Sequence, residues 1–182
     1  MLQIKVPLGP VLWDRKKQEF IEPEYRVLTL EHSLVSLSKW ESKWCKPFLD
    51  PKRQMTTEES IDYIRCMTLT QNVPPETYDR ISQENVDEVS KYIAAPMTAT
   101  WFTDDKKTSK SREIVTSELI YYWMIALNIP MECQKWHLNR LLTLVRICNI
   151  KNAPSKKMSK RATASKYASI NAARRQQLNS KG

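Results

Sequence analysis

Glycine is almost absent from the sequence: only Gly9 and Gly182 occur among 182 residues. Average usage would give roughly 13 glycines in a chain of this length. The phosphate-binding loops of nucleotide-binding proteins and the dinucleotide fingerprint both need several glycines at fixed spacing. The sequence therefore excludes both kinds of nucleotide site, and scarce glycine favours helices over a tight-turn β architecture.

The side chains that usually carry catalysis are sparse and isolated. The two histidines are His32 and His137, and neither stands beside a Ser, Cys or Asp in a nucleophile motif. We expect both to be hydrogen-bonded structural residues. The acidic pairs at residues 58–59 and 104–105 fit a helix start and a solvated loop better than general acid–base chemistry. We predict that the protein is not an enzyme and uses no cofactor.

Cysteine spacing argues against disulfides and metal. The four cysteines are scattered, at Cys45, Cys66, Cys133 and Cys148. Because the first residues lack the apolar segment of a secretory signal, we expect reduced thiols in a cytosolic protein. Cys133 and His137, four residues apart on one predicted helix, have the spacing of two zinc ligands, but no matching second pair exists, so no metal site is predicted.

Acidic residues are missing from the C-terminal end. From Cys133 onward there are 12 Lys and Arg and no Asp or Glu, which leaves 17 of the 29 basic residues and all 20 acidic residues in the first 132. A slightly acidic body therefore carries a strongly basic end. This pattern suggests an anionic partner, and a solvated tail that only aids solubility is the alternative.

The most apolar stretch, residues 119–129, predicts the centre of the fold. Only Asn128 is polar in it, so a helix here should be surrounded by protein, and it is too short to span a bilayer. Pro130 ends this helix, and a second helix is expected from Met131 to Asn149. The two helices predict an αα-hairpin that forms the core.

The first 30 residues predict a small β-sheet. Apolar and polar residues alternate over residues 2–6, and residues 11–13 and 19–21 flank a charged segment as in a β-hairpin. Residues 25–30 predict a further strand. Its inward-facing side chains are expected to be those of Val27 and Tyr25.

Residues 31–95 predict amphipathic helices. Apolar residues recur at three- and four-residue steps over residues 32–44. Thr56 and Glu59 form a capping box at the start of the next helix, and Ser82 caps a later one.

The fold class predicted is mainly α with small β elements (α+β), with a basic helical tail. A second β-hairpin is expected where residues 97–103 pair with residues 112–116. The predicted body, residues 1–153, contains the small sheet (1–30), helices (31–95), the second hairpin (97–116) and the core helix pair (117–149), and the tail follows at residues 154–182.

The tail should gain its structure from a partner. Residues 155–182 contain eight Lys and Arg and few large apolar side chains. Residues 159–178 favour a helix, yet their apolar stripe is too thin to fix that helix to a core. The tail lacks the interleaved aromatics of a single-strand nucleic-acid groove.

Candidate partner-binding residues come from the tryptophans and the tail. Most of the six tryptophans should lie in the core. For two of them the sequence favours a core position and a partner anchor equally: Trp44, flanked by Lys43, and Trp101, on the second predicted hairpin. The basic candidates are Lys156, Lys157, Lys160, Arg161, Lys166, Arg174 and Arg175.

Several stretches of the sequence carry a family resemblance. They are LEHSLVSLSKWESKW at residues 30–44, DYIRCM at 62–67, MTAT at 97–100, the run at 121–154, KKMSK at 156–160 and NAARR at 171–175. Together they resemble a family of small proteins encoded among the tail genes of long-tailed, siphovirus-type bacteriophages, some of which are labelled tail assembly chaperone. The similarity covers most of the chain, the tail included.

The resemblance implies a helical chaperone in the host cytoplasm. Such a protein coats the hydrophobic tape measure protein, helps recruit tail-tube subunits, and is often made in two lengths by a programmed frameshift. The resemblance assigns no binding residues. Two other functions stay open: a self-associating structural component of the virion tail or neck, and a nucleic-acid-binding accessory protein whose tail contacts phosphates. No membrane association is expected.

Overall fold

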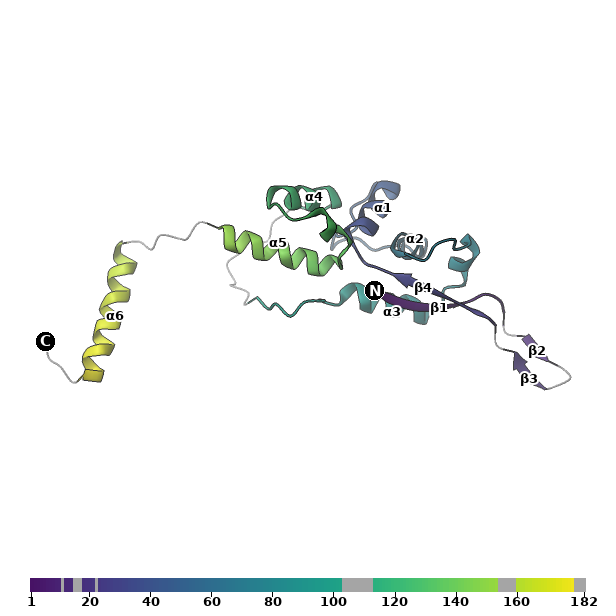
Figure 1. Cartoon of the computed structure of the whole chain (residues 1–182), viewed down its shortest axis with the longest axis horizontal. Coiled ribbons are helices and arrows are strands. Elements are labelled where there is room, and N and C mark those ends of the chain that lie inside the picture. Colours follow the sequence, from purple (N-terminus) through teal and green to yellow (C-terminus); the bar gives the residue numbers. More distant parts are fainter. Residues whose placement is uncertain (11, 15–17, 22, 103–112, 154–159, 179–182) are drawn as a thin grey trace. The chain divides into compact units, whose positions relative to one another are not determined.

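The computed structural model describes residues 1–10, 12–14, 18–21, 23–102, 113–153 and 160–178. As predicted, it is mainly helical with small antiparallel β elements (Figure 1). The chain divides into two units, Met1–Asn149 and Ile150–Gly182. The elements, in chain order, are β1 (Leu2–Pro7), β2 (Leu12–Asp14), β3 (Glu19–Ile21), β4 (Tyr25–Leu30), α1 (Leu34–Trp44), α2 (Thr57–Met67), the 3₁₀ helix η1 (Pro75–Arg80), α3 (Gln83–Ala94), α4 (Ser117–Ala126), the 3₁₀ helix η2 (Met131–Lys135), α5 (Leu138–Asn152) and α6 (Lys160–Leu178).

The N-terminal strands form two antiparallel pairs, β1 with β4 and β2 with β3. Ile4 lies opposite Leu28 in the register of β1 and β4, and both are buried. The expectation that Val27 and Tyr25 face inward is wrong, because they are 44% and 49% exposed. Neighbouring residues of a strand point to opposite faces, so burying Leu28 turns Val27 outward.

The predicted helix caps are confirmed. The Thr56 side chain accepts a hydrogen bond from the Glu59 backbone, and the Glu59 side chain accepts one from the Thr56 backbone, as a capping box requires. Ser82 caps α3 through the Asn85 N–H. At α1 the cap is Ser33.

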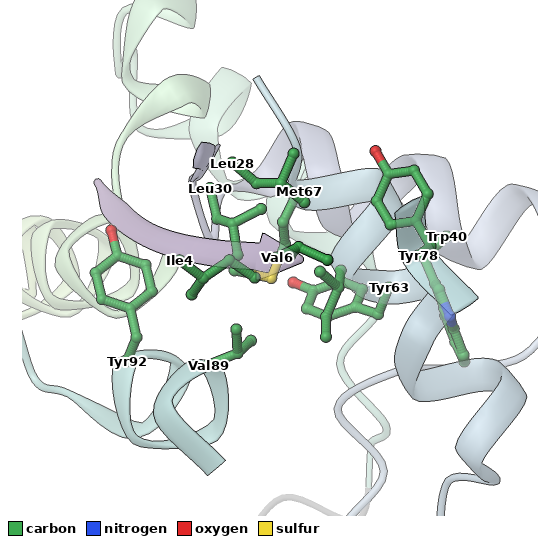
Figure 2. Close-up of a cluster of buried hydrophobic side chains, with 11 residues drawn as sticks. Ile4, Val6, Leu28, Leu30, Trp40, Tyr63, Met67, Tyr78, Val89 and Tyr92 are labelled. Atoms are coloured by element: carbon green, nitrogen blue, oxygen red, sulfur yellow. The ribbon is translucent and has the colours of Figure 1, made fainter. Parts of the chain in front are cut away.

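Helix α1 supplies residues to two hydrophobic clusters. Trp40 belongs to the first cluster, shown in Figure 2, and Leu34 and Leu37 belong to the second. The buried members of the first are Ile4, Val6, Leu28, Leu30, Trp40, Tyr63, Ile64, Met67, Tyr78, Val89 and Tyr92. Those of the second are Leu34, Leu37, Ile120, Met124, Ile129, Cys133, Leu138, Leu141 and Val145. The core therefore extends well beyond the predicted αα-hairpin, whose residues occur only in the second cluster.

The second helix of that hairpin begins later than predicted. Residues Met131–Lys135 form η2, and α5 starts at Leu138. The intervening backbone pairs with the start of α1: the Leu138 N–H donates to the His32 carbonyl at 2.7 Å, and Ser33 and His137 form an antiparallel bridge. This pairing holds the chain extended before α5 and prevents a continuous helix.

The predicted second hairpin is also wrong in its described part. Residues 97–102 and 113–116 form no strand. Met97 has a φ of 50°, and this left-handed conformation interrupts an extended strand at its first residue. The rest of the predicted hairpin, residues 103–112, lies outside the described residues.

Candidate partner-binding surface

Helix α4 is apolar on nearly every side, yet the body covers only part of it. Ile120 and Met124 are fully buried in the second cluster. Tyr122 is 63% exposed and Ile125 is 67% exposed, and neighbouring Ala126 is exposed as well. Ile125 and Ala126 follow Tyr122 by three and four residues, so both lie on the same face of the helix as Tyr122. The described residues of the body therefore leave one side of α4 open to solvent. The expectation that protein surrounds this helix on all sides is wrong.

We call the exposed face formed by Tyr122, Ile125 and Ala126 the α4 face. Its helix is held firmly from the other side. The buried Glu41 carboxylate of α1 accepts hydrogen bonds from the Ser117 N–H at 2.7 Å and the Phe48 N–H at 2.8 Å. A carboxylate at a helix N-terminus is also favoured by the helix dipole. The α4 face is therefore presented in a fixed orientation.

The C-terminal end of α4 is closed by local backbone bonds. The Leu127 N–H donates to the Trp123 carbonyl, and the Ile129 N–H donates to the Met124 carbonyl. Asn128 adopts a left-handed φ of 52° between them, which turns the chain toward η2. In Figure 1, α4 and α5 lie one above the other at one end of the body.

Other apolar side chains are exposed on the β elements. Trp13 and Phe20 face each other across β2 and β3, with ring centroids 4.7 Å apart, and are 50% and 70% exposed. Tyr25 and Val27 lie on the exposed face of β4. None of these exposed side chains is among the sequence-based candidates, although the β2–β3 hairpin itself is predicted.

The two candidate tryptophans have different environments. Trp44 packs against the first cluster: its ring stacks on Trp40 with centroids 6.1 Å apart, and its Nε1–H donates to Asp62 Oδ2 at 2.8 Å. Trp101 is 88% exposed. Trp44 therefore has a structural role in the body, and Trp101 has the exposure that a partner anchor needs.

The basic candidates lie in or beside α6. Arg174 and Arg175 are exposed on that helix. The side chains of Lys160, Arg161 and Lys166 are outside the described residues, as are Lys156 and Lys157 entirely.

Both histidines are buried and hydrogen-bonded, as predicted. His32 Nδ1 lies 2.5 Å from the Tyr63 hydroxyl, and His137 Nε2 lies 3.1 Å from the Tyr92 carbonyl oxygen. Burial and the neighbouring His137 lower the pKa of His32 to about 3.

Cys133 and His137 do not share a helix, since Cys133 lies in η2 and His137 precedes α5. The expectation that these two residues lie four positions apart on one helix, as two zinc ligands would, is therefore wrong. The described residues contain no group of three or more His, Cys, Asp or Glu placed to hold a metal ion.

No family model, curated protein or solved structure matches the chain. Within the described part of the chain, every helix is too short or too polar to cross a bilayer.

Proposed function

We propose that the protein is a tail assembly chaperone of a long-tailed bacteriophage, which holds an apolar helical segment of the tape measure protein against the α4 face. The observation that carries this proposal is the exposure of Tyr122 and Ile125 on a helix whose opposite side is buried. Single exposed apolar residues are common on protein surfaces. Tyr122 and Ile125, in contrast, are neighbours on one face of a rigid helix, and one of them is aromatic. Such a pair is typical of a surface that anchors an amphipathic partner helix.

The expected strength of this contact suits reversible binding. Full burial of a large apolar side chain contributes about 1.5–3 kcal/mol. Tyr122 and Ile125 are each about two-thirds exposed, so a partner helix that covers both gains about 2–4 kcal/mol from them. Such a contact keeps an apolar client soluble while allowing its later release to the tail-tube subunits.

Helix α6 supports a role in contacting a further partner. Every α6 side chain that the structure describes is exposed, including Tyr167, Ile170, Arg174 and Arg175. A helix with an uncovered basic surface fits an acidic protein such as a tube subunit, or the phosphates of a nucleic acid.

Co-expression with the tape measure protein tests the proposal. The wild-type chain should keep the tape measure protein in the soluble fraction and co-purify with it, and Tyr122→Ser should lower the soluble yield several-fold. Tyr25→Ser is the matched control, because it makes the same change at an exposed tyrosine of β4. Equal yields with both variants and the wild type would exclude the α4 face as the client site.

Two other results would replace the proposed function. Fixed copies of the chain in purified virions would identify a structural component of the tail or neck. Salt-dependent DNA binding, without any effect on tape measure solubility, would identify a nucleic-acid-binding accessory protein.

A further inference from the structure

A pocket of about 330 Å³ opens beside the N-terminal half of α1. Much of its wall is apolar and comes from α1, α2 and the segment after α2: Val35 of α1, Cys66 and Met67 of α2, and Leu69 two residues beyond α2. Leu69 is 54% exposed, so the apolar surface continues outside the pocket. The exposed residues Lys39 and Lys135 also line it.

The charge of this pocket is positive and largely uncompensated. Among the described residues, no acid forms an ion pair with Lys39 or Lys135. Glu31 is the one acid among the described residues of the lining. It accepts a hydrogen bond from the Tyr92 hydroxyl at 2.8 Å and lies 3.2 Å from the Met1 ammonium group, so it already has partners. Helix α1 has no acidic residue in its first turn, so no acidic side chain there offsets the positive end of its dipole.

The polar groups in the lining leave the pocket suited to an apolar occupant. The Ser36 hydroxyl donates to the Ser33 carbonyl at 2.8 Å and accepts from the Ser33 N–H at 2.9 Å, so these groups satisfy each other. Burial raises the pKa of the Cys66 thiol, which therefore stays neutral and behaves as a small apolar group.

We propose that this pocket takes an apolar side chain of the bound tape measure segment, and that Lys39 and Lys135 pair with an acidic residue next to that side chain. The inference rests on the proposed function. It adds which segment of the tape measure protein is bound: an apolar segment that contains an acidic residue. Lys135 of the pocket lining lies at the end of η2, the element that follows α4 along the chain.

Three synthetic peptides test the charge rule on the full chain. They share one amphipathic 16-residue pattern of leucine and glutamine and differ at two adjacent positions, which hold Glu, Gln or Lys. By fluorescence anisotropy, the wild-type chain should bind the Glu peptide about tenfold more tightly than the Gln peptide, and added salt should reduce this preference. The variant Lys39→Glu/Lys135→Glu should prefer the Lys peptide instead.

The matched control is Lys91→Glu, which reverses an exposed lysine of α3 outside the pocket lining and should keep the preference for Glu. Circular dichroism checks that each variant is folded, and Lys39→Gln gives a milder change that should lower the Glu preference without reversing it. Equal binding of the Glu and Gln peptides by the wild type, or the same effect from Lys91→Glu, would overturn the proposal.

The outcomes separate this inference from the proposed function. If Tyr122→Ser abolishes binding of every peptide while the lysine variants change nothing, the pocket proposal fails and the α4 face still stands. If no peptide binds and the tape measure protein stays insoluble, the proposed function itself fails. Decanoate is a further probe. If it binds the wild type but not the double variant, and the peptides show no preference, the pocket binds a small amphiphile, and the proposed preference for an acidic tape measure segment is wrong.

Discussion

The two buried histidines predict that mild acid destabilises the fold. His32 and His137 are 2% and 6% exposed, and their ring centroids lie 5.1 Å apart. The Asn139 N–H donates to His137 Nδ1, and Nε2 faces the Tyr92 carbonyl, so the neutral ring protonated at Nε2 satisfies both partners. A second proton on Nδ1 would point at the Asn139 N–H and break that bond. Two positive rings at this distance would also repel each other.

The magnitude follows from the pKa of each ring. Burial and the neighbouring His137 lower the pKa of His32 from 6.5 to about 3, and burial also lowers the pKa of His137. The unfolded chain takes up these protons near pH 6.5 and the folded chain does not. The folded state therefore has its full free energy of unfolding, as far as these two histidines are concerned, above pH 6.5. It loses part of this free energy as the pH falls from 6.5 toward 3. Each pH unit below 6.5 costs about 1.4 kcal/mol per group, so at pH 5 His32 alone removes about 2 kcal/mol.

Urea unfolding at pH 7, 6 and 5 measures this loss. With an ordinary dependence on urea, the midpoint should fall by about 1 M between pH 7 and pH 5. Glu59 does not affect the measurement between pH 7 and pH 5. The hydrogen bond from Lys46 lowers the pKa of Glu59 from 4.5 to about 2, so its contribution to stability is lost only below pH 4.5. His32→Gln should lower the midpoint at pH 7 but flatten its pH dependence. An unchanged wild-type midpoint at pH 5, or an NMR titration of His32 near pH 6.5 in the folded protein, would refute the reasoning.

Two further predictions concern the body and the tail. Leu141→Ala removes a fully buried side chain of the second cluster and should lower the free energy of unfolding by about 3 kcal/mol. Trp123→Ala, at a partly buried position, should lower it less. Wild-type-like melting of Leu141→Ala would contradict the assigned core. Deleting residues 154–182 should leave the melting temperature of the body nearly unchanged in calorimetry, and it should flatten the salt dependence of binding to an anionic partner. A melting temperature several degrees lower would mean that the tail stabilises the body.

The features that the sequence predicted well are local. The capping box of Thr56 and Glu59 and the cap of Ser82 each depend on residues three positions apart, so the pattern contains all the partners. The β2–β3 hairpin is equally local. For β4, alternation showed which residues share a face but not which face the body would cover, and Val27 was placed on the wrong one.

The features that the sequence missed depend on distant pairs. The chain stays extended before α5 because His137 pairs with Ser33 at the start of α1, and no pattern within residues 131–137 signals this. In α4, composition showed an apolar helix but not how many of its sides would find a neighbour. The α4 face was missed for that reason, and the lysine-lined pocket was missed because α1, α2 and η2 meet only in the folded chain.

Helix α1 connects the body's stability to the surfaces proposed to bind the client. Its buried residues fix it between the two clusters, Lys39 lines the pocket, and Glu41 holds the start of α4. A change of Tyr122 should therefore alter binding without altering stability, whereas a change of Glu41 should alter both.

Glu41→Gln tests whether the orientation of α4 matters. The amide retains one acceptor oxygen for the two N–H groups that the carboxylate now serves, so one buried backbone group loses its partner at a cost of about 1–3 kcal/mol. Amides in the first turn of α4 should then exchange faster with solvent, and the affinity for the leucine-containing peptides should fall although every residue of the α4 face is unchanged. If exchange accelerates and the affinity stays the same, the α4 face binds by unspecific apolar adhesion, and its fixed orientation has no part in recognising the client.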